Sequence, residues 1–167
     1  MAKKRYVLIG SLCLLIGFCL ITALINPAIA LAGSSNNIKD DLDYLTADEI
    51  ESIQWEIDQV GSAHDLDVVI VITDQTEGKS SRDFADDYFD YNGFGIGEDA
   101  SGLLLLINME AREVLISTSG KAIDIFTDSR IDSILDAVAP NLTDGNYYNA
   151  SMEFISQIEK HAQSGIP

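Results

Sequence analysis

The sequence predicts an α/β fold, a three-layer α/β/α sandwich built around a small mixed sheet. Two uninterrupted apolar runs, 68–72 and 103–107, are typical of strands buried on both faces. A helical pattern lies between them, so the two strands are expected to be parallel neighbours joined by a right-handed crossover. A tight turn after the second run returns the chain as an antiparallel third strand. Helices are then needed on both faces to bury the sheet.

The first helix is predicted from a capping box, in which Thr46 accepts from the Glu49 amide and Glu49 reaches back. Apolar residues follow at helical spacing up to about His64: Ile50, Ile53, Ile57 and Val60. The run 68–72 is β-branched throughout, which favours a strand.

The next helix is expected from about Arg82 to Tyr91, where Asn92-Gly93 ends it. The second strand covers 103–107, and the third covers 113–118. A helix is predicted to start at Asp128 and to end at Pro140. A last helix follows Asp144-Gly145. The expected order is helix, strand, helix, strand, strand, helix, helix.

The charge is strongly negative and unevenly distributed. The 167 residues hold 27 acids and 10 bases, a net charge of −17. Residues 1–32 contain three bases and no acid, which leaves −20 on the rest. A charge of this sign excludes a simple nucleic-acid-binding protein, which needs a basic surface.

The N-terminus has the composition of an export signal. Lys3-Lys4-Arg5 precedes a long apolar run, and Ala30-Leu31-Ala32 fits a cleavage site. The apolar run is long enough to span a bilayer as an uncleaved anchor instead. Residues 1–32 are therefore a signal peptide or a membrane anchor, 33–45 a linker, and 46–163 the folded domain. Either alternative predicts an extracytoplasmic domain, secreted or anchored to the membrane.

Four aspartates fall on one face of the helix predicted over 82–91. At 100° per residue they lie opposite the aromatic side chains: Asp83, Asp86, Asp87 and Asp90. The simplest interpretation is a solvated face. However, three of the four lie towards the helix C-terminus, where the helix dipole disfavours anions. The segment from Arg82 to Arg112 contains no further base, so a bound cation would balance the charge.

The topology is expected to gather some of these acids at one edge of the sheet. The 82–91 helix leads into the second strand near Asp99, and the antiparallel third strand returns to the same edge before Asp128. Carboxylates from such loops suit Ca²⁺, or Mg²⁺. The predicted metal ligands are Asp86, Asp87, Asp99 and Asp128. An N-cap role for Asp128 is the structural alternative.

Several short segments, in this order and spacing, resemble the TPM domain family over about 40–163. These are Leu45-Thr46, the 68–72 strand, Phe84-Ala85 to Gly97, Gly102 with four leucines, Arg112, Thr127-Asp128, Pro140 and Asp144-Gly145-Asn146-Tyr147. The resemblance implies a three-layer α/β fold. It also implies a relation to the thylakoid acid phosphatase and to exported bacterial proteins.

Two functions follow as hypotheses. The first is an exported module that binds a divalent cation, Ca²⁺ above all, and interacts with an unidentified membrane or cell-surface protein. The alternative, implied by the resemblance, is a metal-assisted phosphatase acting on phosphate monoesters. In that case Asp87 and Asp128 would serve as catalytic groups, as metal ligands or as the base. A plain soluble domain is the third possibility.

Overall fold

A computed structural model describes residues 36–167 of the chain. The elements follow the order β1 (Ile38–Asp40), α1 (Ala47–His64), β2 (Asp67–Thr73), α2 (Ser81–Tyr91), β3 (Gly102–Asn108), β4 (Glu113–Ser119), α3 (Ala122–Ile125), α4 (Asp128–Thr143) and α5 (Tyr147–Ser164). The predicted signal or anchor, 1–32, lies outside the described residues. Within 36–167, no helix combines the length and apolar character that crossing a membrane requires.

The four strands form one mixed sheet in the order β1-β2-β3-β4. β2 and β3 are parallel, and β3 and β4 are antiparallel, which confirms the predicted pairing. β1 was not predicted: it lies inside 33–45, which the sequence had suggested was a linker, and pairs in parallel with β2. Its three residues, Ile38 to Asp40, carry only one apolar side chain, so hydrogen bonding to β2 rather than a sequence pattern defines the strand.

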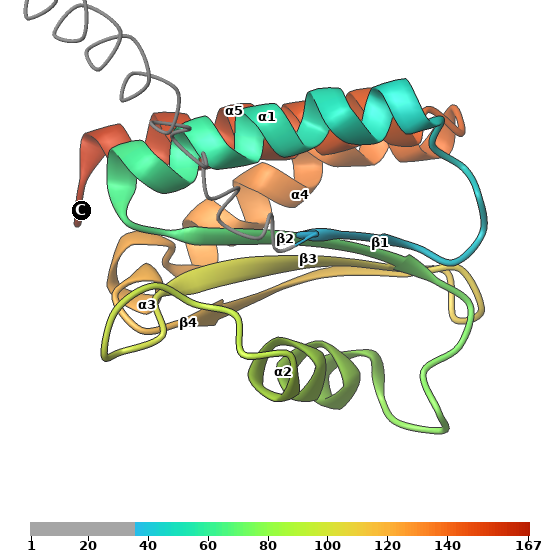
Figure 1. Cartoon of the computed structure of the whole chain (residues 1–167), viewed down its shortest axis with the longest axis horizontal. Coiled ribbons are helices and arrows are strands. Elements are labelled where there is room, and N and C mark those ends of the chain that lie inside the picture. Colours follow the sequence, from blue (N-terminus) through green and yellow to red (C-terminus); the bar gives the residue numbers. More distant parts are fainter. Residues whose placement is uncertain (1–35) are drawn as a thin grey trace, which may run out of the picture. The chain divides into compact units, whose positions relative to one another are not determined.

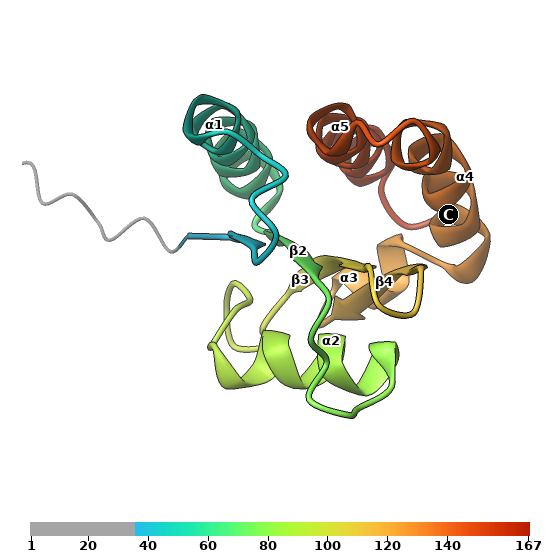
Figure 2. The same ribbon diagram turned by 90° about the vertical axis from the view of Figure 1, so that its right-hand side faces the viewer.

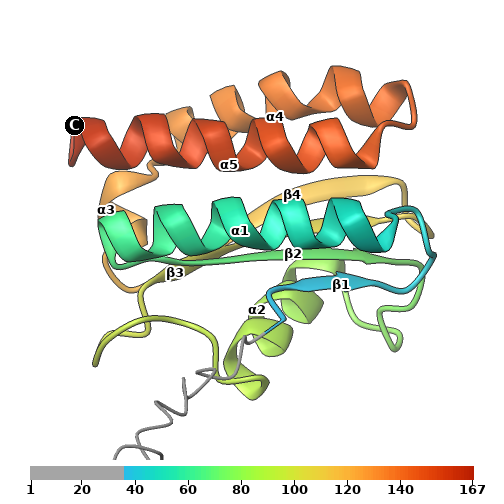
Figure 3. The same ribbon diagram turned by 45° about the horizontal axis from the view of Figure 1, so that its top comes forward.

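Helices cover both faces of the sheet, so the predicted three-layer α/β/α arrangement is confirmed. α1, α4 and α5 lie on one face and α2 on the other (Figures 1 and 2). α5 packs between α1 and α4, as the tilted view also shows (Figure 3). Each face therefore has a core of its own.

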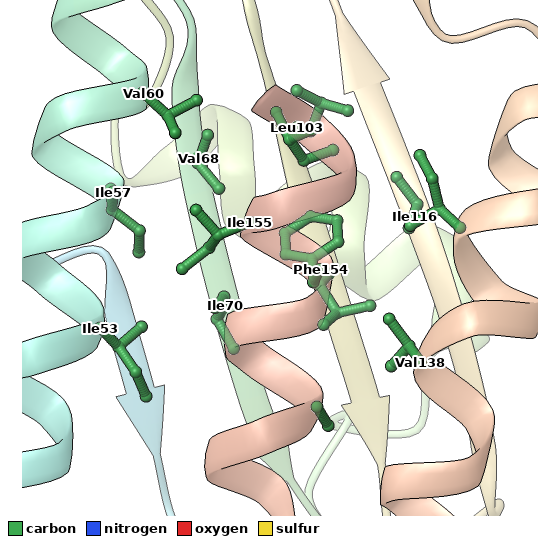
Figure 4. Close-up of a cluster of buried hydrophobic side chains, with 14 of the residues drawn as sticks. Ile53, Ile57, Val60, Val68, Ile70, Leu103, Ile116, Val138, Phe154 and Ile155 are labelled. Atoms are coloured by element: carbon green, nitrogen blue, oxygen red, sulfur yellow. The ribbon is translucent and has the colours of Figure 1, made fainter. Parts of the chain in front are cut away.

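The larger core lies under α1, α4 and α5. Phe154 and Ile155 of α5 point into it and meet side chains of the sheet and of both neighbouring helices (Figure 4). The smaller core joins α2 to the other face of the same strands: Val69, Val71, Leu104 and Leu106 meet Phe84, Ala85 and Phe89. Successive residues of β2 and β3 thus point into different cores, which explains their unbroken apolar runs.

Local signals defined most of the helix bounds, with one exception. The predicted capping box of Thr46 and Glu49 is present, and α1 ends at His64 as expected. The predicted stop at Pro140 was wrong, because α4 continues to Thr143. Pro140 lies in the last turn of α4, where its missing N–H removes only one backbone hydrogen bond. Leu142, two residues later, packs against the core and stabilises that turn.

Candidate functional site: an acidic groove beside β4

A groove of about 820 Å³ runs along β4, between α2 and α4. Its floor is five consecutive residues of β4, 115–119. Figure 2 shows α4 on one side of β4 and α2 on the opposite face of the sheet. Side chains from both helices form the walls: Arg82, Asp86, Phe89 and Asp90 from α2, and Asp128, Ile131, Asp132 and Leu135 from α4.

α2 presents its acidic face to this groove because its aromatic face is buried. Phe84 and Phe89 pack against the sheet, as the predicted amphipathic pattern requires. Asp86 and Asp90 are left exposed on the polar side. The Ser117 hydroxyl of β4 donates to a carboxylate oxygen of Asp86 at 2.5 Å, which fixes that side chain at the groove wall.

α4 supplies the opposite wall from its first two turns. Asp128 is the first residue of α4, where a carboxylate is stabilised by the N-terminal end of the helix dipole. Thr127 occupies the N-cap position and its side chain makes no capping hydrogen bond, so Asp128 is not the N-cap of α4. Asp132 follows one turn later, and the half-buried Ile131 and Leu135 add apolar surface between the acids.

Asp87 lies apart from the other predicted ligands. It forms an ion pair with Lys79 at 2.9 Å, and this hydrogen bond and charge raise the pKa of Lys79 above its usual value. Lys79 precedes α2, just outside the segment in which the sequence contains no base. The local charge that seemed to need a bound cation is thus partly balanced by a side chain of the protein.

Asp99 approaches the β4 end of the sheet through its backbone. A β-carbon on Gly120 would lie 2.4 Å from the Asp99 carbonyl oxygen, so the two loops are in close contact. The glycine at this position also has φ +58°, which favours a residue without a side chain. Of the four predicted metal ligands, the structure therefore brings only Asp86 and Asp128 into one groove.

The predicted set also missed members of the groove. Asp90 was visible as part of the acidic helix face, but its place in a groove that α4 also lines depends on tertiary packing. Asp132 was not singled out, although it follows Asp128 at i+4 and so shares its helix face. Arg82 is the single base among the lining residues. Four carboxylates and one guanidinium make the groove attractive to cations.

The described part of the chain, 36–167, contains no group of three or more His, Cys, Asp or Glu side chains arranged to hold a metal ion. Nor do the histidines enter the groove. His64 contacts Glu159 at 3.1 Å, and His161 lies edge-on to Phe126. Burial, followed by the nearby charges of Arg130 and Lys160, lowers the pKa of His161.

Comparison with known proteins supports the fold independently. A family model described as the TPM domain matches residues 38–161. The UPF0603 protein YdjH of Bacillus subtilis (strain 168) is 28% identical over 128 residues, covering 77% of this chain and 48% of that protein. The chain thus spans about half the length of this curated relative.

Solved structures of similar fold include an N-terminal domain from P. gingivalis, with a TM-score of 0.68 and 21% identity over 80% of this chain and 86% of that one. The BA42 protein of Bizionia argentinensis gives a TM-score of 0.66 and 17% identity, with 77% and 88% coverage. The N-terminal domain of cg2496 from Corynebacterium glutamicum gives 0.60 and 18%, with 75% and 79%. At these identities the likeness concerns the fold.

Proposed function

Because this chain belongs to the TPM domain family, and a fold does not by itself imply a function, we propose from its site that it is an exported binding module. Its proposed binding site is the acidic groove beside β4, and its ligand is a cationic group of a membrane or cell-surface partner. The observation that carries this proposal is the convergence of Asp86 and Asp90 from α2 with Asp128 and Asp132 from α4 around one hollow.

The charge of the whole molecule supports the same proposal. The net charge of −20 beyond residue 32 attracts any cationic partner over a distance of about one Debye length, roughly 8 Å at physiological salt. The groove adds local specificity, because carboxylates from two helices line it on either side of β4. Binding is therefore expected to weaken with salt and to depend on these four side chains.

The test uses fluorescein-labelled hexalysine as the probe and fluorescence anisotropy as the readout. The Asp86→Asn/Asp128→Asn variant is compared with Asp58→Asn/Asp74→Asn, which removes the same charge outside the groove. We expect the groove variant to weaken binding about tenfold, and the control by about twofold or less. Equal losses in the two variants would reject the groove as the site.

Calcium binding is a narrower proposal. The residues of the groove do not form a ready ligand set for Ca²⁺ or Mg²⁺, which needs several oxygens in a closed arrangement. What favours Ca²⁺ is the density of carboxylates, so loose binding with side-chain movement is proposed. Millimolar Ca²⁺ should then raise the Tm by mass action. Asp128→Asn should reduce that shift, and Asp87→Asn, whose carboxylate is engaged by Lys79, should not.

The alternative, phosphate monoester hydrolysis, has less support from the groove residues. Four carboxylates facing one arginine repel a phosphate ester. Neither histidine of the domain is close enough to line the groove as a general acid or base. We therefore expect equal phosphate release from a generic ester by the wild type and by Asp128→Ala, with Ca²⁺ or Mg²⁺ present. A selective loss in the variant would favour the phosphatase.

Export is proposed from the pattern of residues 1–32 alone. Intact-mass measurement of the chain recovered from cells and medium tests it. A mass corresponding to a start at Gly33 supports a cleaved signal, and the full-length mass in the membrane fraction supports an anchor. Retention of the full-length chain in the cytoplasm would contradict both.

A further inference from the structure

β4 is a terminal strand of the sheet, and its outer side is the floor of the acidic groove. It spans seven residues, Glu113–Ser119, and pairs with β3 in unbroken register. No further strand of the sheet formed by 36–167 lies beyond it. An edge of this kind is a template for a strand supplied by another chain.

The hydrogen bonds of β3 identify the backbone groups of β4 that face outward. The Met109 amide donates to the Thr73 carbonyl, so odd-numbered residues of β3 face β2 and even-numbered ones face β4. The antiparallel register then turns the odd-numbered residues of β4 towards β3. The N–H and C=O groups of Val114, Ile116 and Thr118 therefore point to the open edge.

β4 also lacks the features that usually protect an edge. Proteins blunt exposed edge strands with shortness, lysine, proline or a bulge. The other edge strand, β1, has only three residues, with Lys39 in its centre. β4 is more than twice as long and contains no lysine and no proline, and its register has no bulge. Its openness therefore calls for a functional explanation.

The groove has the form that an added strand needs. Side chains of β4 alternate: Leu115 and Ser117 face α2, whereas Ile116 packs on the α4 side. A strand laid against β4 would alternate in the same way between the walls. Its side chains would meet Asp86 and Asp90 on one side, and Asp128, Asp132 and the apolar Ile131 and Leu135 on the other.

From this arrangement we infer that β4 binds an extended segment of a partner protein by strand addition, and that the segment carries lysine or arginine at alternate positions. Backbone bonds to the three outward residues supply affinity, and the carboxylates of the one wall that the alternate basic side chains face select them. This inference rests on the proposed function, because it specifies how a cationic ligand occupies the same groove.

Charge complementarity favours this occupant over a second copy of the chain. Pairing β4 with β4 would bring the four groove carboxylates of two copies together, in domains that each carry −20. Like charges directly opposed across strands are unfavourable. Association of the protein with itself, measured by sedimentation, is accordingly an outcome that would overturn the choice of partner.

The test uses labelled peptides of alternating lysine and valine, eight residues long, titrated with the full-length protein. Two further peptides carry N-methyl groups on the lysines only or on the valines only. In an added strand, alternate amides bond to β4, so methylation should weaken binding about tenfold in one pattern and hardly at all in the other. A tenfold loss corresponds to about one or two net hydrogen bonds.

The methylation pattern that weakens binding also shows whether the added strand runs parallel or antiparallel to β4. In an antiparallel addition the bonding residues share a face with Ile116, and in a parallel addition they share the opposite face. Equal effects of both patterns would overturn strand addition while leaving cation binding by the groove intact. Failure of the unmethylated peptide to bind, with hexalysine still bound through the groove, would also overturn it. Failure of both probes would reject the proposed function itself.

A matched pair of protein variants provides the second test. Thr118→Pro removes an outward N–H that β3 does not use, a position where an edge strand tolerates proline. Thr118→Val keeps that N–H and the size of the side chain. We expect Thr118→Pro to bind the lysine–valine peptide at least fivefold more weakly than Thr118→Val, at similar Tm. Equal affinities would overturn the inference.

Discussion

Adding one methyl group at the start of β3 is expected to destabilise the sheet. Gly102 pairs with Asp67, the first residue of β2. A β-carbon on Gly102 would lie 2.5 Å from the Asp67 carbonyl oxygen and 2.8 Å from Cζ of Phe89. The φ angle of Gly102 is not positive, so Gly102→Ala tests steric fit without a backbone penalty.

The obstacle at Gly102 is difficult to move. Pairing with β3 holds the backbone of Asp67, and its side chain is also fixed, because it accepts hydrogen bonds from Asn37 and from the Gly95 amide. Overpacking of this kind costs about 1–3 kcal/mol. Alanine also has less backbone entropy than glycine in the unfolded chain, which stabilises the folded state by about 0.4–1 kcal/mol. The net loss in the free energy of unfolding is therefore about 1–2 kcal/mol, or about 4–8 °C in Tm for a domain of this size.

Urea unfolding followed by circular dichroism measures this loss. We expect Gly102→Ala to lower the midpoint and leave the m-value unchanged. The control is Gly97→Ala: Gly97 has φ +77° and no heavy atom within 4 Å of an added β-carbon, so only its backbone conformation is penalised. It should lose about 1–2 kcal/mol from its left-handed backbone alone, with no steric contribution. An unchanged midpoint for Gly102→Ala, whose backbone carries no such penalty, would refute the steric argument.

Three further predictions concern the upper layer of helices. Thr46→Ala removes the cap that accepts from the Glu49 amide and should cost about 1 kcal/mol in urea unfolding, whereas Thr46→Ser should be nearly neutral. Phe154→Ala empties a fully buried site and should cost about 3–5 kcal/mol; a loss below about 1 kcal/mol would contradict the packing. Since burial lowers the pKa of His161, folding favours its neutral form, and stability falls as the pH drops below the unfolded value near 6.5. His161→Gln should lack this loss, so its stability relative to the wild type should rise between pH 7.5 and 5, and a pH-independent difference would contradict the shift.

Much of the fold could be predicted because its signals are local. The capping box at Thr46 and the apolar runs of β2 and β3 each depend on neighbouring residues alone, and the structure confirms them. The four-residue α3 and the three-residue β1 escaped prediction, because elements this short are too brief for a periodic pattern to repeat. Pairing with β2 holds β1, and packing on β4 and on the larger core holds α3.

Part of the candidate site could likewise be predicted from local sequence, and part depends on contacts in the folded structure. Helical phasing of the sequence identified the acidic face of α2, which includes Asp86 and Asp90, because the positions of side chains around a helix follow from their spacing alone. Phasing could not show which of these carboxylates would meet a base, and Asp87 is paired with Lys79 from the preceding loop. It also could not reveal that Asp132 on α4 would share a groove with them.

The sequence by itself determined the layered α/β class, the order of the main elements and the concentration of negative charge beyond residue 32, because periodicity and composition are properties of the chain. Only the tertiary structure decided that β4 ends the sheet, and that α2 and α4 flank its open edge with carboxylates. The reason is physical: whether a strand lies at an edge depends on which neighbours it has in space. The residues of a strand do not show whether another strand will pair with each of its two sides.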